Sequence, residues 1–175
     1  MQVSMHNWMR AEPVETTIRR LAKYGYDSIE ISYDSVELNP GAPGTQAVRG
    51  MLKENGVKCY GSISLMFAGR DLIHADSAVR ANSVDYLKKC VTMVKELDGR
   101  VMSIVPSEVG KVKAMASPEE EWRWAIEGLK EVYAHCRKEG VMMALEPLNR
   151  FETNFLNRHD QALLLAESVA PDVGV

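Results

Sequence analysis

The chain has 175 residues, of which 46% are hydrophobic and 26% are charged, so it can bury one hydrophobic core and fits a single globular domain. This composition excludes a disordered chain and a small scaffold held together by disulfides. The 21 basic and 24 acidic residues give a net charge of −3, which offers no electrostatic basis for binding nucleic acid or an anionic membrane. The three cysteines form no Cys-x-x-Cys pair, and we find no signal peptide or membrane-spanning run, so we expect a cytoplasmic protein.

One pattern recurs along the chain: a helical segment ends at a glycine, and a short apolar strand follows within a few residues. These glycines are Gly25, Gly56, Gly99 and Gly140, and we expect each to adopt the left-handed backbone conformation that other residues resist. In chain order, the predicted strands span residues 3–8, 27–32, 57–64, 100–105 and 141–146.

The segments between these strands carry apolar residues at helical spacing. The clearest helix starts at Ser117, because Ser117-Pro118-Glu119-Glu120 is a capping box with proline in the first turn. A last helix runs from about residue 160 to 170 and stops before Pro171. Residues 173–175 then indicate the start of a sixth strand.

This alternation of strands and helices predicts an α/β fold with a parallel sheet. Five strand–helix units and a short sixth strand do not close an eight-stranded barrel, which needs about 250 residues. An open, doubly wound sheet could be complete at this length. However, no Gly-x-Gly-x-x-Gly sequence follows the first strand, which weakens a dinucleotide-binding interpretation.

Polar residues end several of the predicted strands, where parallel β/α folds place their active groups. Glu146 is the first candidate, because a carboxylate that ends a buried strand is costly unless it is paired or bound to a cation. It could be a ligand for a divalent metal, an acid/base group, or both. It could equally form a structural salt bridge, for example to Arg150.

Other strand ends and loops supply weaker candidates. Glu152 could bind a sugar hydroxyl or lie free in water, and Glu30 could have a supporting or a structural role. His6 and Trp8 could form the floor and wall of a sugar pocket, although a packed core histidine and tryptophan are the commoner finding. Ser64 is a further candidate substrate contact at the end of the third strand.

The run Leu-Glu-Pro-Leu-Asn-Arg-Phe-Glu-Thr-Asn-Phe-Leu-Asn, from Leu145 to Asn157, resembles the fifth-strand motif of xylose-isomerase-like barrels. It is most similar to the ketose 3-epimerases of tagatose and allulose type, which the segment 71–97 also resembles. The resemblance implies a (β/α)8 TIM barrel. Residues 1–175 would then be the N-terminal part of a single barrel domain, with about five βα units and the start of strand 6.

The resemblance also implies a role for each matching residue. Glu146 would bind a divalent metal, Mn²⁺ first with Co²⁺ or Mg²⁺ as alternatives, and act as one of two acid/base carboxylates. Glu152 would hydrogen-bond hydroxyls near the carbonyl of a ketose or oxo-sugar substrate. The implied activity is a metal-dependent sugar isomerase or epimerase in a homo-oligomer. The remaining ligands, an Asp, a His and a second Glu, would lie beyond Val175, so we expect this chain alone to be catalytically incompetent.

Two alternatives stay open. The tract Gly69-Arg70-Asp71-Leu72 and the segment 105–112 look similar to the metal-binding subunit of C-glycoside deglycosidases, which are lyases that act with a small second subunit. The chain could also be a non-catalytic half-barrel that binds sugar. Such a half-barrel would expose two strand edges and an apolar interior.

Overall fold

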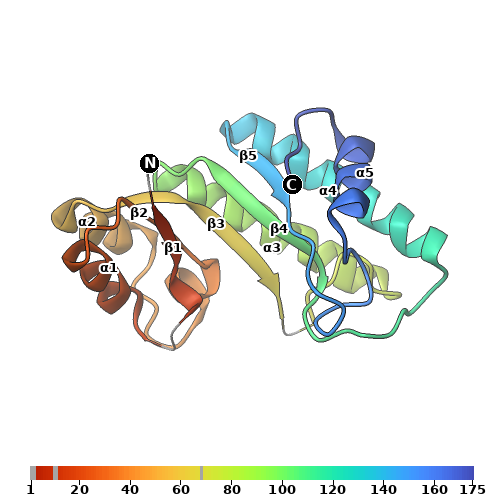
Figure 1. The fold of residues 1–175 in the computed structure, drawn as a ribbon, viewed down its shortest axis with the longest axis horizontal. Helices are drawn as coiled ribbons and strands as arrows, with labels where there is room; N and C mark the ends of the chain where they lie inside the picture. Colours follow the sequence, from red (N-terminus) through yellow and green to blue (C-terminus); the bar gives the residue numbers. More distant parts are fainter. Residues whose placement is uncertain (1–2, 10–11, 68) are drawn as a thin grey trace.

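The computed structural model describes residues 3–9, 12–67 and 69–175 and shows one curved sheet with helices along it (Figure 1). The sheet contains five parallel strands in the order β1-β2-β3-β4-β5. The strands are β1 Ser4–His6, β2 Ser28–Glu30, β3 Lys58–Met66, β4 Val101–Glu108 and β5 Met142–Leu145. The α-helices are α1 Val14–Lys23, α2 Thr45–Asn55, α3 Ser77–Glu96, α4 Pro118–Glu139 and α5 His159–Val169.

The strand order distinguishes between the two predicted architectures. Each strand pairs with its neighbour in sequence, so the order never reverses as it does at the switch point of a doubly wound sheet. Beyond β5, the amide of Leu145 donates to the carbonyl of Gly174 (2.9 Å), and that of Gly174 donates to Met143 (2.9 Å). Residues 173–175 therefore begin a sixth parallel strand, and the predicted α/β fold of a partial TIM barrel is confirmed.

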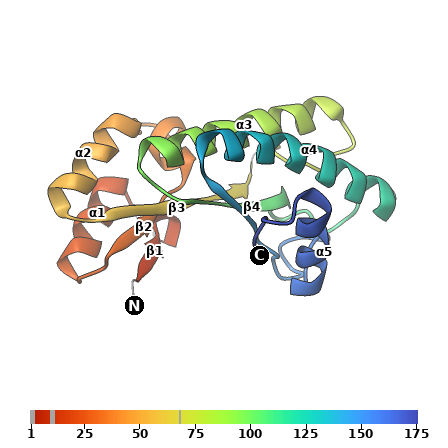
Figure 2. The same ribbon diagram turned by 90° about the horizontal axis from the view of Figure 1, so that it is seen from above.

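The helices lie along the outer side of the curved sheet and leave its inner side open (Figure 2). One buried cluster packs α3, α4 and α5 on β3 to β5, with Leu87, Leu129 and Ile104 fully buried. A second packs α1 and α2 on β2 through Ile18 and Ile29. None of the helices within the described ranges is long and apolar enough to cross a membrane.

Most of the predicted helix ends are confirmed. Ser117 and Glu120 form the reciprocal capping box of α4, and Gly56 and Gly140 end α2 and α4 in the left-handed conformation. The prediction for Gly99 is wrong, because the left-handed residue after α3 is Asp98 (φ 58°). Gly99 is instead required by close packing, since a Cβ there would lie 2.9 Å from Cγ1 of Val94.

Every strand differs from its predicted bounds by one to three residues at one end or both, and the ends of β1 and β4 differ for a local reason. β1 stops at His6 because the side chain of Asn7 turns inward, where it accepts from the amide of Ser32 (2.8 Å) and donates to Ser35 (2.7 Å). Residues Asn7–Met9 then form a 3₁₀ turn. β4 continues past Pro106 to Glu108, because a register shift in the facing strand accommodates a residue that has no N–H to donate.

Candidate active site

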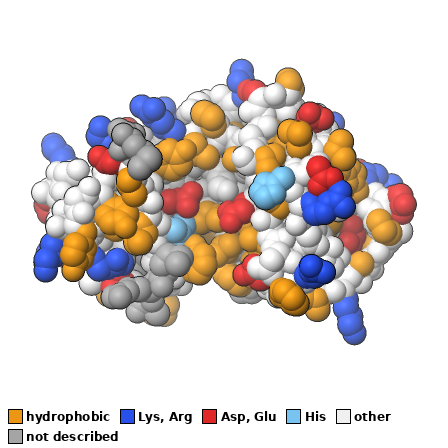
Figure 3. Space-filling model, viewed as in Figure 1, with side chains coloured by type: hydrophobic (Ala, Val, Ile, Leu, Met, Phe, Trp, Pro, Cys, Tyr) orange, Lys and Arg blue, Asp and Glu red, His pale blue; other side chains and the backbone are white. Residues whose placement is uncertain are grey.

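The carboxyl ends of the parallel strands lie at the same end of the sheet, where the active groups of such folds gather. Figure 3 looks onto the hollow inner face of the sheet and shows acidic side chains in its middle. His6 ends β1 and pairs in register with Glu30, which ends β2. Glu146 directly follows β5, and its amide donates to the carbonyl of Ile104 (2.9 Å), so the strand ladder holds its backbone in place. Three of the predicted site residues thus share one end of the sheet.

Glu146 is a half-buried carboxylate with one hydrogen-bonding side chain, Ser103 of β4, whose hydroxyl lies 3.4 Å from Oε2. Burial raises the pKa of Glu146, the Ser103 hydrogen bond lowers it, and the negative charge of Glu152 raises it. Within the described residues Glu146 forms no salt bridge, and Arg150 is exposed. The alternative of a structural salt bridge to Arg150 is therefore wrong.

Glu30 lies close enough to Glu146 for their charges to interact. Burial raises the pKa of Glu30, and the charge of Glu146 raises it further. Glu30 and Glu146 have no positive partner among the residues that the structure describes, and such a pair suits a bound divalent cation, which would offset both charges. Across the part of the chain that the structure describes, however, no three His, Cys, Asp or Glu side chains come together as a complete metal site.

His6 pairs in register with Glu30, and Trp8 packs on His6. The Trp8 amide donates to Nδ1 of His6 (3.0 Å), and the two rings meet edge to face with centroids 5.4 Å apart. Trp8 lies on the 3₁₀ turn after β1 and is 51% exposed, so its ring faces solvent as a pocket wall would. Burial lowers the pKa of His6 to about 3, and its Nε2 is buried without a partner among the described residues.

We expect His6 to make the chain acid-sensitive. A histidine whose pKa is lower in the folded than in the unfolded state contributes stability above pH of about 6.5, and that contribution is lost as the pH falls toward about 3. When the pH is lowered from 7 to 4, the urea concentration at the midpoint of unfolding should fall less for the variant His6→Gln than for the unmodified chain. Equal losses in the two proteins would contradict a buried neutral His6.

The other predicted residues divide between the hollow face and the core. Glu152, in the loop after β5, accepts from the side-chain amide of Asn149 and is partly exposed. Ser64 is fully buried, in register with the buried core residue Ile104. Because a side chain with no accessible surface cannot contact a sugar in the hollow, we leave Ser64 out of the proposed site.

The tract after β3 is held inside the protein. The guanidinium of Arg70 forms two hydrogen bonds to Asp34 (2.9 and 2.6 Å) and stacks 3.9 Å from the ring centre of Tyr86. Asp71 is fully buried and pairs with Lys111. Neither charged group is free to bind a ligand, which removes one of the features that suggested a deglycosidase.

A cavity of about 600 Å³ lies at the opposite end of the sheet, next to the amino ends of β2, β3 and β4. Its lining includes Arg49, Lys53, Lys58 and Arg100. Active groups of parallel β/α folds lie at the carboxyl ends of the strands, so this cavity is not the candidate active site.

Comparison with known proteins gives a consistent result. Residues 18–175 match the protein family described as xylose isomerase-like TIM barrel. The chain is 30% identical over 159 residues to the L-ribulose 3-epimerase of Mesorhizobium japonicum, with 91% of this chain and 52% of the relative covered. It is 24% identical over 163 residues to the D-psicose 3-epimerase of Agrobacterium fabrum, with 87% of this chain and 53% of the relative covered.

Solved structures agree on the fold. A structure of L-ribulose 3-epimerase has a TM-score of 0.83 at 26% identity and covers 99% of this chain and 59% of that protein. The D-psicose 3-epimerase of Clostridium cellulolyticum H10, solved with D-tagatose, has a TM-score of 0.85 at 19% identity, over 99% of this chain and 62% of that protein. The chain thus spans about half the length of the curated relatives and about 60% of the solved structures.

Proposed function

Because this chain belongs to the xylose isomerase-like TIM barrel family, we propose that it supplies part of the active site of a metal-dependent ketose 3-epimerase. The observation that carries the proposal is Glu146, a half-buried carboxylate at the carboxyl end of β5 with no cationic partner among the described residues. Its burial and the nearby charges of Glu30 and Glu152 make this position unfavourable for an anion unless a cation is bound.

The proposed reaction removes the proton on the carbon next to a ketose carbonyl. A divalent cation, Mn²⁺ first with Co²⁺ or Mg²⁺ as alternatives, supplies the charge that makes this proton acidic. Glu146 would hold that cation and would also accept the proton, because an ionised carboxylate can act both as a metal ligand and as a base. Glu152 accepts hydrogen bonds from sugar hydroxyls, and a second carboxylate returns a proton on the other face.

His6 and Trp8 form one wall of the proposed pocket. The exposed Trp8 ring offers an apolar surface on which the C–H face of a sugar packs. The buried, neutral His6 fixes that ring through the Trp8 amide and the edge-to-face contact. The His6 side chain therefore acts mainly through Trp8.

The 175 residues alone are proposed to be catalytically incompetent. The described residues offer Glu146 and no set of three metal ligands, and the chain spans about half of its curated relatives. A decisive test joins Val175 to the remaining C-terminal segment of the M. japonicum L-ribulose 3-epimerase, which completes the barrel. The chimera and the chain alone are incubated with L-ribulose and Mn²⁺ in deuterium oxide.

We expect the chimera to form the C3 epimer with deuterium at C3, and to stop doing so when EDTA removes the metal. The chain alone should give neither product nor exchange. A chimera that melts cooperatively and binds Mn²⁺ but leaves C3 unlabelled would contradict the proposal. Release of an aglycone from a 3-oxo-C-glycoside, without C3 epimerisation, would favour the deglycosidase alternative.

A further inference from the structure

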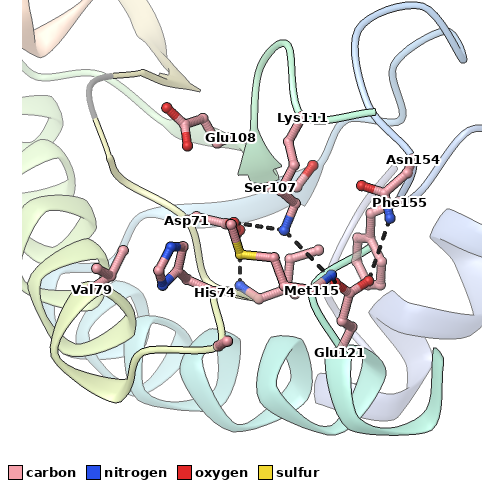
Figure 4. A network of polar contacts seen from close by, with 12 residues as sticks. Asp71, His74, Val79, Ser107, Glu108, Lys111, Met115, Glu121, Asn154 and Phe155 are labelled. Atoms are coloured by element: carbon pink, nitrogen blue, oxygen red, sulfur yellow. Dashed lines mark hydrogen bonds and ion pairs between the residues drawn. The ribbon is translucent and has the colours of Figure 1, made fainter. Parts of the chain in front are cut away.

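A buried lysine connects the three loops that follow β3, β4 and β5 (Figure 4). The Nζ atom of Lys111 lies 2.6 Å from Oδ2 of Asp71 and 3.9 Å from Oε1 of Glu121. The three side chains are 8%, 0% and 3% exposed, respectively. Buried charges of this kind persist only when they are paired and hydrogen-bonded, so their positions are closely defined.

The two carboxylates have further partners that fix their orientation. Oδ1 of Asp71 accepts from the amide of Ile73 (3.0 Å). Glu121 lies in the first turn of α4, where the helix dipole favours a negative charge, and its Oε1 accepts from the amide of Met115 (2.8 Å). The ammonium of Lys111 is therefore held between two anchored acids.

Backbone hydrogen bonds join Gly110 and Lys111 to the loop that carries Glu152. The amide of Gly110 donates to the carbonyl of Glu152 (2.6 Å), and the amide of Asn154 donates to the carbonyl of Lys111 (2.9 Å). These bonds form an isolated parallel bridge between Lys111 and Thr153. The side-chain amide of Asn154 also reaches Oε2 of Glu121 (3.4 Å). The loop and the ion cluster are thus joined at residues 152–154.

We propose that Lys111 is a positioning residue, whose buried ion pairs hold Glu152 in place at the hollow face. Lys111 is too buried to touch a substrate, so it acts through the loop backbone. The inference rests on the proposed role of Glu152 in binding ketose. It deepens that role by assigning part of the pocket geometry to a cluster outside the pocket.

The first experiment measures residue-resolved amide exchange in the 175-residue chain. In Lys111→Met, the amides of Gly110 and Asn154 should exchange at least about tenfold faster, while amides of α5 change less than about twofold. The matched control Lys113→Met removes an exposed lysine from the same loop. It should leave the exchange rates unchanged both at Gly110 and Asn154 and in α5. Uniform acceleration across α5 and the loop would overturn the proposal, because it would indicate general destabilisation.

Lys111→Met leaves two buried carboxylates unpaired and could prevent folding. The triple variant Asp71→Asn/Lys111→Met/Glu121→Gln removes all three charges and keeps the side chains close to their original size. It should melt cooperatively and still show faster exchange at Gly110 and Asn154. Unchanged exchange in a folded triple variant would overturn the proposal.

The second experiment asks whether Lys111 acts through Glu152. L-ribulose binding to the metal-free chimera, whose barrel is complete, is followed by amide chemical shifts in four proteins: the unmodified chimera, Lys111→Met, Glu152→Ala and the double variant. We expect Lys111→Met to weaken binding at least about fivefold in the unmodified background and by less than about twofold when Glu152 is already absent. Equal losses in both backgrounds would overturn positioning through Glu152. If the unmodified chimera binds no L-ribulose, the proposed function of Glu152 fails, and the exchange experiment alone decides whether Lys111 positions the loop.

Discussion

Glu146→Gln is expected to abolish the proposed activity and to stabilise the fold at the same time. Glutamine keeps the shape of the side chain but supplies neither a negative metal ligand nor a base. In the chimera, epimerisation of L-ribulose should fall by at least about 100-fold, and Mn²⁺ affinity by at least about tenfold. The melting temperature of the metal-free chain at pH 7 should rise or stay unchanged.

The sign of the stability change follows from the raised pKa of Glu146. A carboxyl whose pKa is raised on folding stabilises the folded state as the pH falls through that pKa, and it opposes folding when ionised at neutral pH. Glu146→Gln removes this penalty, so its stability should depend less on pH between about 4 and 7. The matched control Glu167→Gln changes an exposed residue of α5 and should alter neither activity nor stability. A clear loss of stability at pH 7 in Glu146→Gln would show that the carboxylate has a structural partner.

Gly61→Ala should be the most damaging single substitution for stability. A Cβ at Gly61 would lie 2.0 Å from the carbonyl oxygen of Val101, a backbone atom of the neighbouring central strand. β3 and β4 would have to move apart at their first pair, where Gly61 and Val101 are in register. We expect a loss of about 3 kcal/mol or more, measured by urea unfolding, because backbone atoms cannot rotate away as a side chain can.

Gly50→Ala provides the contrast. Gly50 lies within α2, and a Cβ there would meet no atom within 4 Å. Alanine should stabilise this helix by about 0.5–1 kcal/mol, because it lowers the backbone entropy of the unfolded chain. If both alanine variants unfolded at the same urea concentration, close strand contact at Gly61 would not be the reason for that glycine.

The sequence predicted the features that depend on short segments. The glycines after α2 and α4 and the capping box at Ser117 are local signals, and each is confirmed. The family resemblance rested on the run from Leu145 to Asn157, and the match over residues 18–175 confirms it. Glu146 is a candidate from sequence alone because it is a charged residue at the end of an apolar strand, and its role stays a prediction.

Features that depend on contacts between distant segments were missed. Ser103 reaches Glu146 from the neighbouring strand, and only the register of β4 with β5 brings the two together. Lys111, Asp71 and Glu121 look like ordinary loop and helix charges in the sequence, and nothing in their spacing predicts a buried cluster. Ser64 was assigned to the hollow face, but it lies in the core because strand alternation places it beside Ile104.

The sequential strand order bears on how such a chain folds during synthesis. Since every strand pairs with the one made just before it, each new unit meets a surface that is already formed. Within the described residues, the outer edge of β1 pairs with no other strand, so this edge is still open when β2 to β5 have docked. An open edge invites pairing with other chains. The outer edge of β1 is therefore a site at which this sheet can associate with other chains during synthesis, until another segment covers it.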